Sequence, residues 1–372
     1  MAIGLSHSGP NIFSSPSPAQ ELLVGTLDGV AVLARDGLGA PWRVVHRGLP
    51  GRFISSLVIE PDSGTIFAGA FRGGLHASTD GGRTWEPRDK GLPVDDIFSM
   101  AWRRVGGKVR LFAGTEPARL FYSDDLGHHW TELPALRNVP TVDKWWFPVP
   151  PHVAHTKFIL FDPHDEHVIY ACIEQGALLK SEDDGQTWRE LNTLGFYNDQ
   201  SRSVEHFYDV HKAVVDPRNP QRLIVSGGAG LYITPDNGGH WERRMAPGWA
   251  PDVYPDALLI HPRQPDILFV GAAEHNPATW RQSHHAGGKV YRSRDGGETW
   301  ERLTNGLPED TEHEIGAMTL EDWGTGFSVY AATTGGEVYA SDDGGDHWAL
   351  IARDLTPISK RGHYNLVLAA AS

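Results

Sequence analysis

A short motif recurs along this chain of 372 residues and constrains its fold more than any other feature. In the stretch "YRSRDGGETW", residues 291–300, a small hydroxyl residue is followed by Asp at +2, Gly at +4 and Trp at +7. The same spacing occurs in six copies, which begin at Ser78, Ser123, Ser181, Thr234, Ser293 and Ser341. Repetition at intervals of tens of residues is typical of folds built from one repeated supersecondary unit.

Each copy of the motif predicts a β-hairpin. An apolar strand ends in a small-residue turn, as in "IFAGAFRGG", and a short strand such as "LHAS" leads into the motif. Asp can accept hydrogen bonds from N–H groups of its own turn, and Gly adopts a positive φ at little cost. The Trp begins the next strand and offers a large apolar area for packing. We therefore expect a structural role for the motif carboxylates, which are Asp80, Asp125, Asp183, Asp236, Asp295 and Asp343.

The motif closely resembles the Asp-box, or bacterial neuraminidase repeat, of β-propeller proteins. The resemblance covers about residues 21–371. It extends to sialidases, xyloglucanases, sortilin-type receptors and photosystem assembly factors, and the chain is most similar to soluble, single-propeller bacterial members. Many of those are named glycosyl hydrolase or sialidase-like from the repeat alone. The resemblance implies hairpins at the rim of propeller blades, far from the central site, so it predicts architecture and leaves activity open.

The predicted fold is all-β: a single seven-bladed β-propeller of four-stranded blades over residues 21–372. The chain start, "ELLVGTLDGVAVLARDG", supplies only the later strands of a blade, whereas "HYNLVLAA" at 363–370 is a lone strand. We expect this C-terminal strand to join the N-terminal blade and close the ring, which leaves no free sheet edge. Residues 1–20, rich in Ser and Pro, are expected to form a loosely ordered lead-in.

Composition argues against several classes of protein. The net charge of −14 disfavours binding to nucleic acid and to anionic membranes. The single cysteine, Cys172, permits no disulfide within the chain. The N-terminal stretch lacks the regions of a signal peptide, and no run approaches the ~18–20 apolar residues that span a bilayer. We expect a cytoplasmic protein that meets a small molecule or a glycan at the channel mouth, with a protein partner left open.

Ionisable residues gather where first strands are expected to start, at one mouth of the central channel. The candidate catalytic residues are His155, His211, Tyr254, Asp209 and Glu205. Imidazole with carboxylate from separate strands suits a divalent metal such as Zn, Mn or Fe, and the candidate ligands are His155, His211 and His363. The same groups could act as general acid and base without a metal, or line a polar channel that water satisfies.

Two long connections supply the candidate substrate-binding residues. The connection 135–156 greatly exceeds the usual ~4–6 residues, and its aromatic side chains could form a platform for a sugar or a plug over the channel. The insertion 272–291 could close over a ligand or be a solvated excursion. From these connections and the neighbouring strand starts, the candidates are Trp145, Trp146, His152, His206, Arg52 and Trp280.

The absence of some family signatures from the sequence reduces the number of possible activities. A sialidase needs an arginine cluster and, in family terms, a Phe-Arg-Ile-Pro stretch; the nearest match is "GRFI" at 51–54, so a sialidase is disfavoured. Xyloglucanase-like hydrolases resemble two joined propellers, and one propeller lacks the cleft between them. Two hypotheses remain. The first is a small-molecule- or glycan-acting enzyme of hydrolase or lyase type, metal-dependent if the histidines bind an ion. The second is a non-catalytic scaffold that holds a protein or another ligand.

Overall fold

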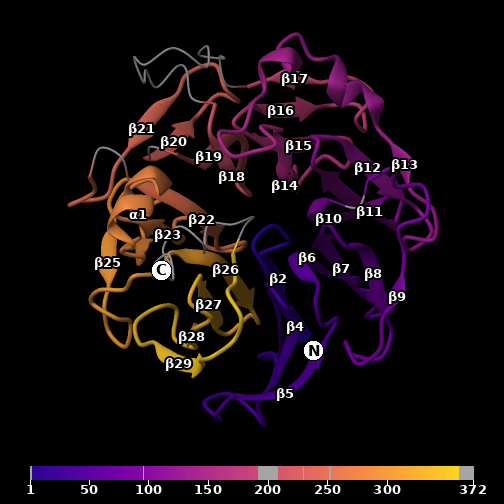
Figure 1. The fold of residues 1–372 in the computed structure, drawn as a ribbon. Coiled ribbons are helices and arrows are strands. Elements are labelled where there is room, and N and C mark those ends of the chain that lie inside the picture. Colours follow the sequence, from indigo (N-terminus) through magenta and orange to yellow (C-terminus); the bar gives the residue numbers. More distant parts are fainter. Residues whose placement is uncertain (1, 95, 192–207, 229, 251–252, 360–372) are drawn as a thin grey trace.

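The chain folds as a seven-bladed β-propeller of four-stranded blades, which confirms the predicted fold class. The computed structural model describes residues 2–94, 96–191, 208–228, 230–250 and 253–359. Figure 1 shows the blades arranged in a ring, with strands such as β14, β18 and β22 facing its centre. No helix in the described part of the chain has the length and apolar character that crossing a bilayer requires.

Each blade is a sheet whose strands pair in chain order. The N-terminal blade contains β1 (Ala2–Leu5), β3 (Glu21–Thr26), β4 (Gly29–Ala34) and β5 (Arg43–Gly48). The next three contain β6 (Phe53–Ile59), β7 (Ile66–Phe71), β8 (Gly74–Ser78) and β9 (Glu86–Pro87); β10 (Ile97–Val105), β11 (Lys108–Thr115), β12 (Leu120–Ser123) and β13 (Thr131–Glu132); and β14 (His155–Phe161), β15 (Ile169–Glu174), β16 (Ala177–Ser181) and β17 (Arg189–Glu190).

The last three blades contain β18 (Val210–Asp216), β19 (Asn219–Gly227), β20 (Gly230–Thr234) and β21 (Glu242–Arg244); β22 (Tyr254–Ile260), β23 (Leu268–Ala273), β24 (Lys289–Ser293) and β25 (Glu301–Leu303); and β26 (Ile315–Asp322), β27 (Phe327–Thr333), β28 (Val338–Ser341) and β29 (Ala349–Ala352). The final blade also carries β2 (Ile12–Ser14) beside β26. A helix, α1 (Pro277–Ser283), lies between β23 and β24, and short 3-10 helices cover Pro134–Asn138 and Val142–Lys144.

The repeated motif forms a hydrogen-bonded turn between the last two strands of its blade. Asp295 accepts from the Ser293 hydroxyl at 2.8 Å, from Thr299 N at 2.9 Å and from Thr299 Oγ1 at 2.6 Å. The Thr299 and Ser293 donors hold the pKa of Asp295 at about 2. Three copies have histidine in place of this threonine and make the same contacts through His129, His240 and His347. These histidines are therefore turn residues.

The N-terminal segment closes the ring. β1 pairs in parallel with β3, and β2 pairs in parallel with β26, so residues 2–14 join the first blade to the last. The prediction of a loosely ordered lead-in over 1–20 is therefore wrong for these strands. Ile3 and Leu5 are fully buried, and apolar burial stabilises a segment whose Ser and Pro content alone argues for disorder. The C-terminal strand expected at 363–370 lies outside the described residues; β1 occupies the position beside β3.

The same segment lies on the axis of the ring. The backbone of Ser8 bonds to β6 and β10, donating to Ser55 O at 3.0 Å and accepting from Met100 N at 3.4 Å. On the opposite side, Asn11 Nδ2 donates to Leu258 O of β22 at 3.0 Å. A segment that touches first strands on both sides must run between them (Figure 1). It therefore fills the position that a central channel would occupy.

Replacing Asp295 by Ala removes three hydrogen bonds from one turn, and we expect the free energy of unfolding to fall by about 1–2 kcal/mol. Urea unfolding at pH 7 measures this change. The matched control is Asp36→Ala. Asp36 lies in "ARDGLGAPW", residues 34–42, a degenerate copy of the motif that precedes the six, and its exposed carboxylate contacts Arg43 at 3.3 Å. Equal effects of the two substitutions would contradict a structural role for the motif carboxylate.

Candidate metal centre at the channel mouth

The first strands of six blades each contain a β-bulge near their start. Pairing with the second strand skips one residue there, and the skipped residues are Ser55, Phe98, Lys157, His211, Asp256 and Gly316. A bulge redirects a side chain and is frequent beside active sites. Three consecutive blades place ionisable groups at this position: Lys157 Nζ lies 2.6 Å and His211 Nδ1 3.8 Å from Asp256 Oδ1. The bulges thus gather charge near the axis.

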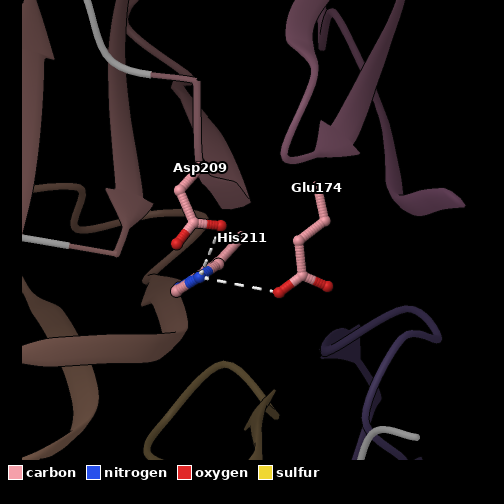
Figure 2. A group of neighbouring side chains, drawn as sticks. All are labelled: Glu174, Asp209 and His211. Atoms are coloured by element: carbon pink, nitrogen blue, oxygen red, sulfur yellow. Dashed lines mark ion pairs between the residues drawn. The ribbon is translucent and has the colours of Figure 1, made fainter. Parts of the chain in front are cut away.

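His211 presents one nitrogen that is fixed and one that has no hydrogen bond. Nδ1 lies 2.7 Å from the carbonyl oxygen of Pro255, which only accepts, so Nδ1 carries a hydrogen. Nε2 is buried and makes no hydrogen bond within the described residues. It faces Asp209 Oδ1 at 3.3 Å and Glu174 Oε1 at 3.7 Å (Figure 2). Metal-binding histidines typically fix their other nitrogen on a carbonyl in this way.

Glu174, Asp209 and His211 form a group that could hold a metal ion. Their ligand atoms all lie within 4.8 Å of one another. Ligands at ~2.1 Å from a tetrahedral ion stand roughly 3.4 Å apart, close to the two distances from His211 Nε2. His211 is fully buried and Glu174 is 1% exposed, whereas the Asp209 side chain is 21% exposed. The site is therefore desolvated on two sides and open toward Asp209.

Glu174 is held by donors from three other blade positions. Its Oε2 lies 2.6 Å from His155 Nε2, and its Oε1 lies 3.2 Å from Lys157 Nζ and 3.4 Å from the Tyr254 hydroxyl. The other nitrogen of His155 faces Glu116 Oε2 at 3.3 Å. His155, predicted as a ligand or catalytic group, thus bridges two carboxylates, and it orients Glu174 instead of joining the three-residue group.

Carboxylates dominate the electrostatics of the mouth. Burial, followed by the charges of Glu174, Asp209, Asp256 and Glu314, raises the pKa of Tyr254 well above its usual value, so Tyr254 stays a phenol. Burial also lowers the pKa of Lys212 to about 8. With Lys157, Lys212 makes two ammonium groups against five carboxylates, which belong to Glu116, Glu174, Asp209, Asp256 and Glu314. Buried negative charge in excess is costly unless a cation or protons neutralise it.

The long connection before β14 covers this mouth, as the sequence suggested. Trp146 N donates to Gln175 O at 3.3 Å, directly after Glu174, and the Phe147 ring packs edge-on against His155 at 5.0 Å. Trp146 is 42% exposed and stacks on His152 with ring centroids 4.8 Å apart. The other predicted tryptophan, at position 145, packs partly buried against the blade. The connection therefore carries one aromatic surface that faces solvent.

Two further predicted residues in the described part of the chain, Trp280 and Arg52, do not belong to the three-residue group. Trp280 is fully buried in α1, donates its indole N–H to His275 O at 2.7 Å and packs edge-on against Tyr254. It is a core residue, so the prediction of substrate contact is wrong. Arg52 lies exposed before β6, away from the three-residue group. Glu205, His206 and His363 lie outside the described residues.

Sequence reasoning missed the residues that tie the site together. Glu174 was not predicted, although an acid stands at the same position of the second strand in two neighbouring blades: Glu116 directly after β11 and Glu174 at the end of β15. That recurrence was the available signal. No sequence signal pointed to His7. Its Nε2 lies 2.9 Å from Asp256 Oδ2 because the N-terminal segment runs along the axis.

Comparisons with known proteins point to propellers. The family model described as "Sortilin, neurotensin receptor 3" matches residues 176–307. The oligoxyloglucan-reducing end-specific xyloglucanase of Emericella nidulans is 24% identical over 235 residues, covering 58% of this chain and 26% of that protein. A Neosartorya fischeri protein named "Probable oligoxyloglucan-reducing end-specific xyloglucanase" is 26% identical over 226 residues, or 52% and 25% of the two chains. The chain thus spans about a quarter of these relatives.

Solved structures agree on the fold. The GH74 xyloglucanase of Xanthomonas campestris superposes with a TM-score of 0.68 at 19% identity, covering 95% of this chain and 55% of that one. The GH74 enzyme of Niastella koreensis superposes with a TM-score of 0.57 at 16% identity, covering 93% of this chain and 54% of that one. At such identities the likeness concerns the fold alone. The comparisons therefore indicate a β-propeller family, here with a buried imidazole–carboxylate centre at one mouth.

We expect His7→Gln to weaken the pH dependence of the free energy of unfolding below pH 6.5. Burial lowers the pKa of His7 to about 3 from an ordinary 6.5. Between these two pH values, His7 is therefore protonated in the unfolded chain and neutral in the folded chain. Stability is complete above pH 6.5 and is lost as the pH falls toward 3, with a slope of up to ~1.4 kcal/mol per pH unit from this group. Urea unfolding at pH 7, 6 and 5 measures the slope, and an unchanged slope in the variant would contradict this assignment.

Proposed function

We propose that this chain is a metal-dependent enzyme of hydrolase or lyase type that acts on a small hydroxylated molecule or a glycan at the channel mouth. The observation that supports it is the buried Nε2 of His211, whose direction is fixed by the Pro255 carbonyl and which faces oxygens of Asp209 and Glu174. A lone pair pointing at two carboxylates is unfavourable in a desolvated site. A divalent cation between them removes that cost.

The ligand set favours zinc, manganese or ferrous iron. One imidazole and two carboxylates form a mixed nitrogen–oxygen site, which these ions accept. Three protein ligands leave at least one coordination position for water or substrate, as in catalytic rather than structural metal sites. An ion held by Glu174, Asp209 and His211 would lower the pKa of a bound water toward neutrality and so supply a nucleophile or base. This is the chemistry that a hydrolase or a lyase requires.

Neighbouring residues would support that chemistry through their protonation states. Tyr254 stays a phenol among carboxylates and can donate a hydrogen bond near Glu174. Lys157 lies between Glu174 and Asp256, at 3.2 and 2.6 Å, and balances part of their charge. Asp209 is the most exposed of the three proposed ligands, so substrate would approach from its side.

A glycan is the substrate class that the relatives favour. The curated relatives are named as xyloglucanases, and the fold of the chain matches GH74 enzymes over most of its length. The chain spans only about a quarter of the curated relatives, so their activity enters here as part of the proposal. The competing hypothesis is a non-catalytic scaffold, which requires no ion at Glu174, Asp209 and His211.

Metal analysis separates the two hypotheses. We expect protein purified without added metal or tag to contain about one transition-metal ion per chain by elemental mass spectrometry, and His211→Ala to have lost it. The matched control is His261→Ala, which removes a histidine that is also fully buried but packs on Phe327 in a neighbouring blade. We expect the control to retain the ion.

Two further readouts sharpen the test. A chelator should lower the melting temperature of the wild type but not that of His211→Ala, because a bound ion stabilises only the folded form. Asp209→Asn, which preserves shape and removes one charged ligand, should weaken metal binding at least 10-fold. Wild-type protein that binds none of zinc, manganese or ferrous iron on reconstitution would refute the proposal and favour the scaffold.

A further inference from the structure

A pocket of about 360 Å³ opens beside the metal centre, between two blades. One wall is formed by residues 247–250 and Val253, which include Trp249; the other is the blade β22–β25, including Lys289 and Tyr291. Cavities of this size suit a ligand of one or two sugar rings. None of the three proposed metal ligands lines it, so the pocket is a separate feature of the mouth.

The pocket combines an aromatic wall with charged groups. Trp249 is partly exposed and meets the Tyr291 ring edge-on, with centroids 5.3 Å apart. Lys289 Nζ lies 2.8 Å from Glu274 Oε1, and these side chains are 7% and 45% exposed. A sugar ring has an apolar face that packs on an aromatic ring and an edge of hydroxyls that both donate and accept. In this pocket, the tryptophan can pack on the apolar face of a sugar, and the ammonium and carboxylate can donate to and accept from its hydroxyls.

The charged side chains of the pocket are engaged with neighbouring groups. Glu274 pairs with Lys289, and the guanidinium of Arg302, which keeps its positive charge, donates to the carbonyl of Glu309. The chain as a whole carries a net charge of −14. Neutral hydroxylated ligands avoid both the desolvation of an unpaired charge and long-range repulsion.

The pocket is connected to the proposed metal centre through Tyr254. Its lining includes Val253 and Ala273, and Ala273 pairs with Tyr254 across β22 and β23. Tyr254 in turn contacts His211 with ring centroids 4.4 Å apart and donates to Glu174. One residue, Tyr254, therefore separates the two features. A chain of sugar units could occupy the pocket with one unit while another reaches the mouth.

We infer that the pocket between β21 and β25 is a glycan subsite that binds a neutral sugar unit on Trp249 with Lys289 and Glu274 bonding to its hydroxyls. This inference adds a substrate-binding site to the proposed function, and the subsite serves catalysis only if the proposed function is correct. Binding itself requires neither metal nor turnover. A failure of the metal centre and a failure of the subsite can therefore be observed separately.

The test is calorimetric titration of full-length, chelator-treated protein with neutral xyloglucan oligosaccharides, in which no turnover can occur. We expect saturable binding to the wild type and at least 10-fold weaker binding to Trp249→Ala. Trp146→Ala removes the other exposed tryptophan of the mouth and should bind within about twofold of wild type. Glu274→Gln should bind less tightly while its melting temperature stays within the range of Trp146→Ala. An oligogalacturonate of equal length should bind more weakly than the neutral probe.

Three results would overturn the subsite. The first is Trp249→Ala that binds as tightly as wild type while its fold is intact by thermal unfolding. The second is a loss of binding on Trp146→Ala alone, which would place the sugar on the connection before β14. The third is no binding of any neutral oligosaccharide to wild type. Metal content is unaffected by each of these results, so the proposed metal centre would stand or fall independently.

Discussion

The N-terminal segment that runs along the axis holds the ring together. A propeller must join its last blade to its first, and this chain does so with two parallel pairings, β1 with β3 and β2 with β26. Between these pairings, Ser8 bonds to β6 and β10 and Asn11 bonds to β22. Because that segment occupies the axis, the side chains of several blades meet beside it, near the starts of the first strands.

The bulges decide which groups meet there. A slip of one residue in a strand moves every side chain to the other face, so the skipped residues Lys157, His211 and Asp256 turn toward one another. The result is an excess of carboxylate in a desolvated volume. Such an arrangement lowers the stability of the fold unless a positive charge neutralises the carboxylates. Lys157 and Lys212 supply part of that charge; a divalent ion at His211 would supply the rest.

The sequence predicted the blades well and the site in part, for different physical reasons. The motif constrains the fold because Asp295 and its equivalents accept hydrogen bonds within a few residues of themselves, so local spacing is sufficient. His211, Tyr254 and Asp209 were predicted because blade counting places them at the entrances of first strands, where several blades face one mouth. Glu174 lies at the end of a second strand, in a different blade from Asp209 and His211, so the only sequence signal for it was the acid at the same position of the preceding blade. Trp280 was misassigned because a loop tryptophan beside histidines resembles a ligand platform, whereas α1 buries it.

The N-terminus shows a second limit of pattern analysis. Its Ser and Pro content argues for disorder, yet Ile3 and Leu5 become core residues once β3 is available as a pairing partner. His7 then joins Asp256, a residue 249 positions away. Contacts at such separation follow from closure of the ring, which only the folded structure displays.

The most direct measurement is anomalous diffraction from crystals grown with Zn²⁺, recorded on both sides of the zinc absorption edge. The account predicts a peak about 2.0–2.3 Å from His211 Nε2 and from oxygens of Asp209 and Glu174, with Nδ1 still on the Pro255 carbonyl. A mouth without a peak, in which a protonated His211 donates from Nε2 to Asp209, would contradict it: the imidazole would then itself be the missing positive charge.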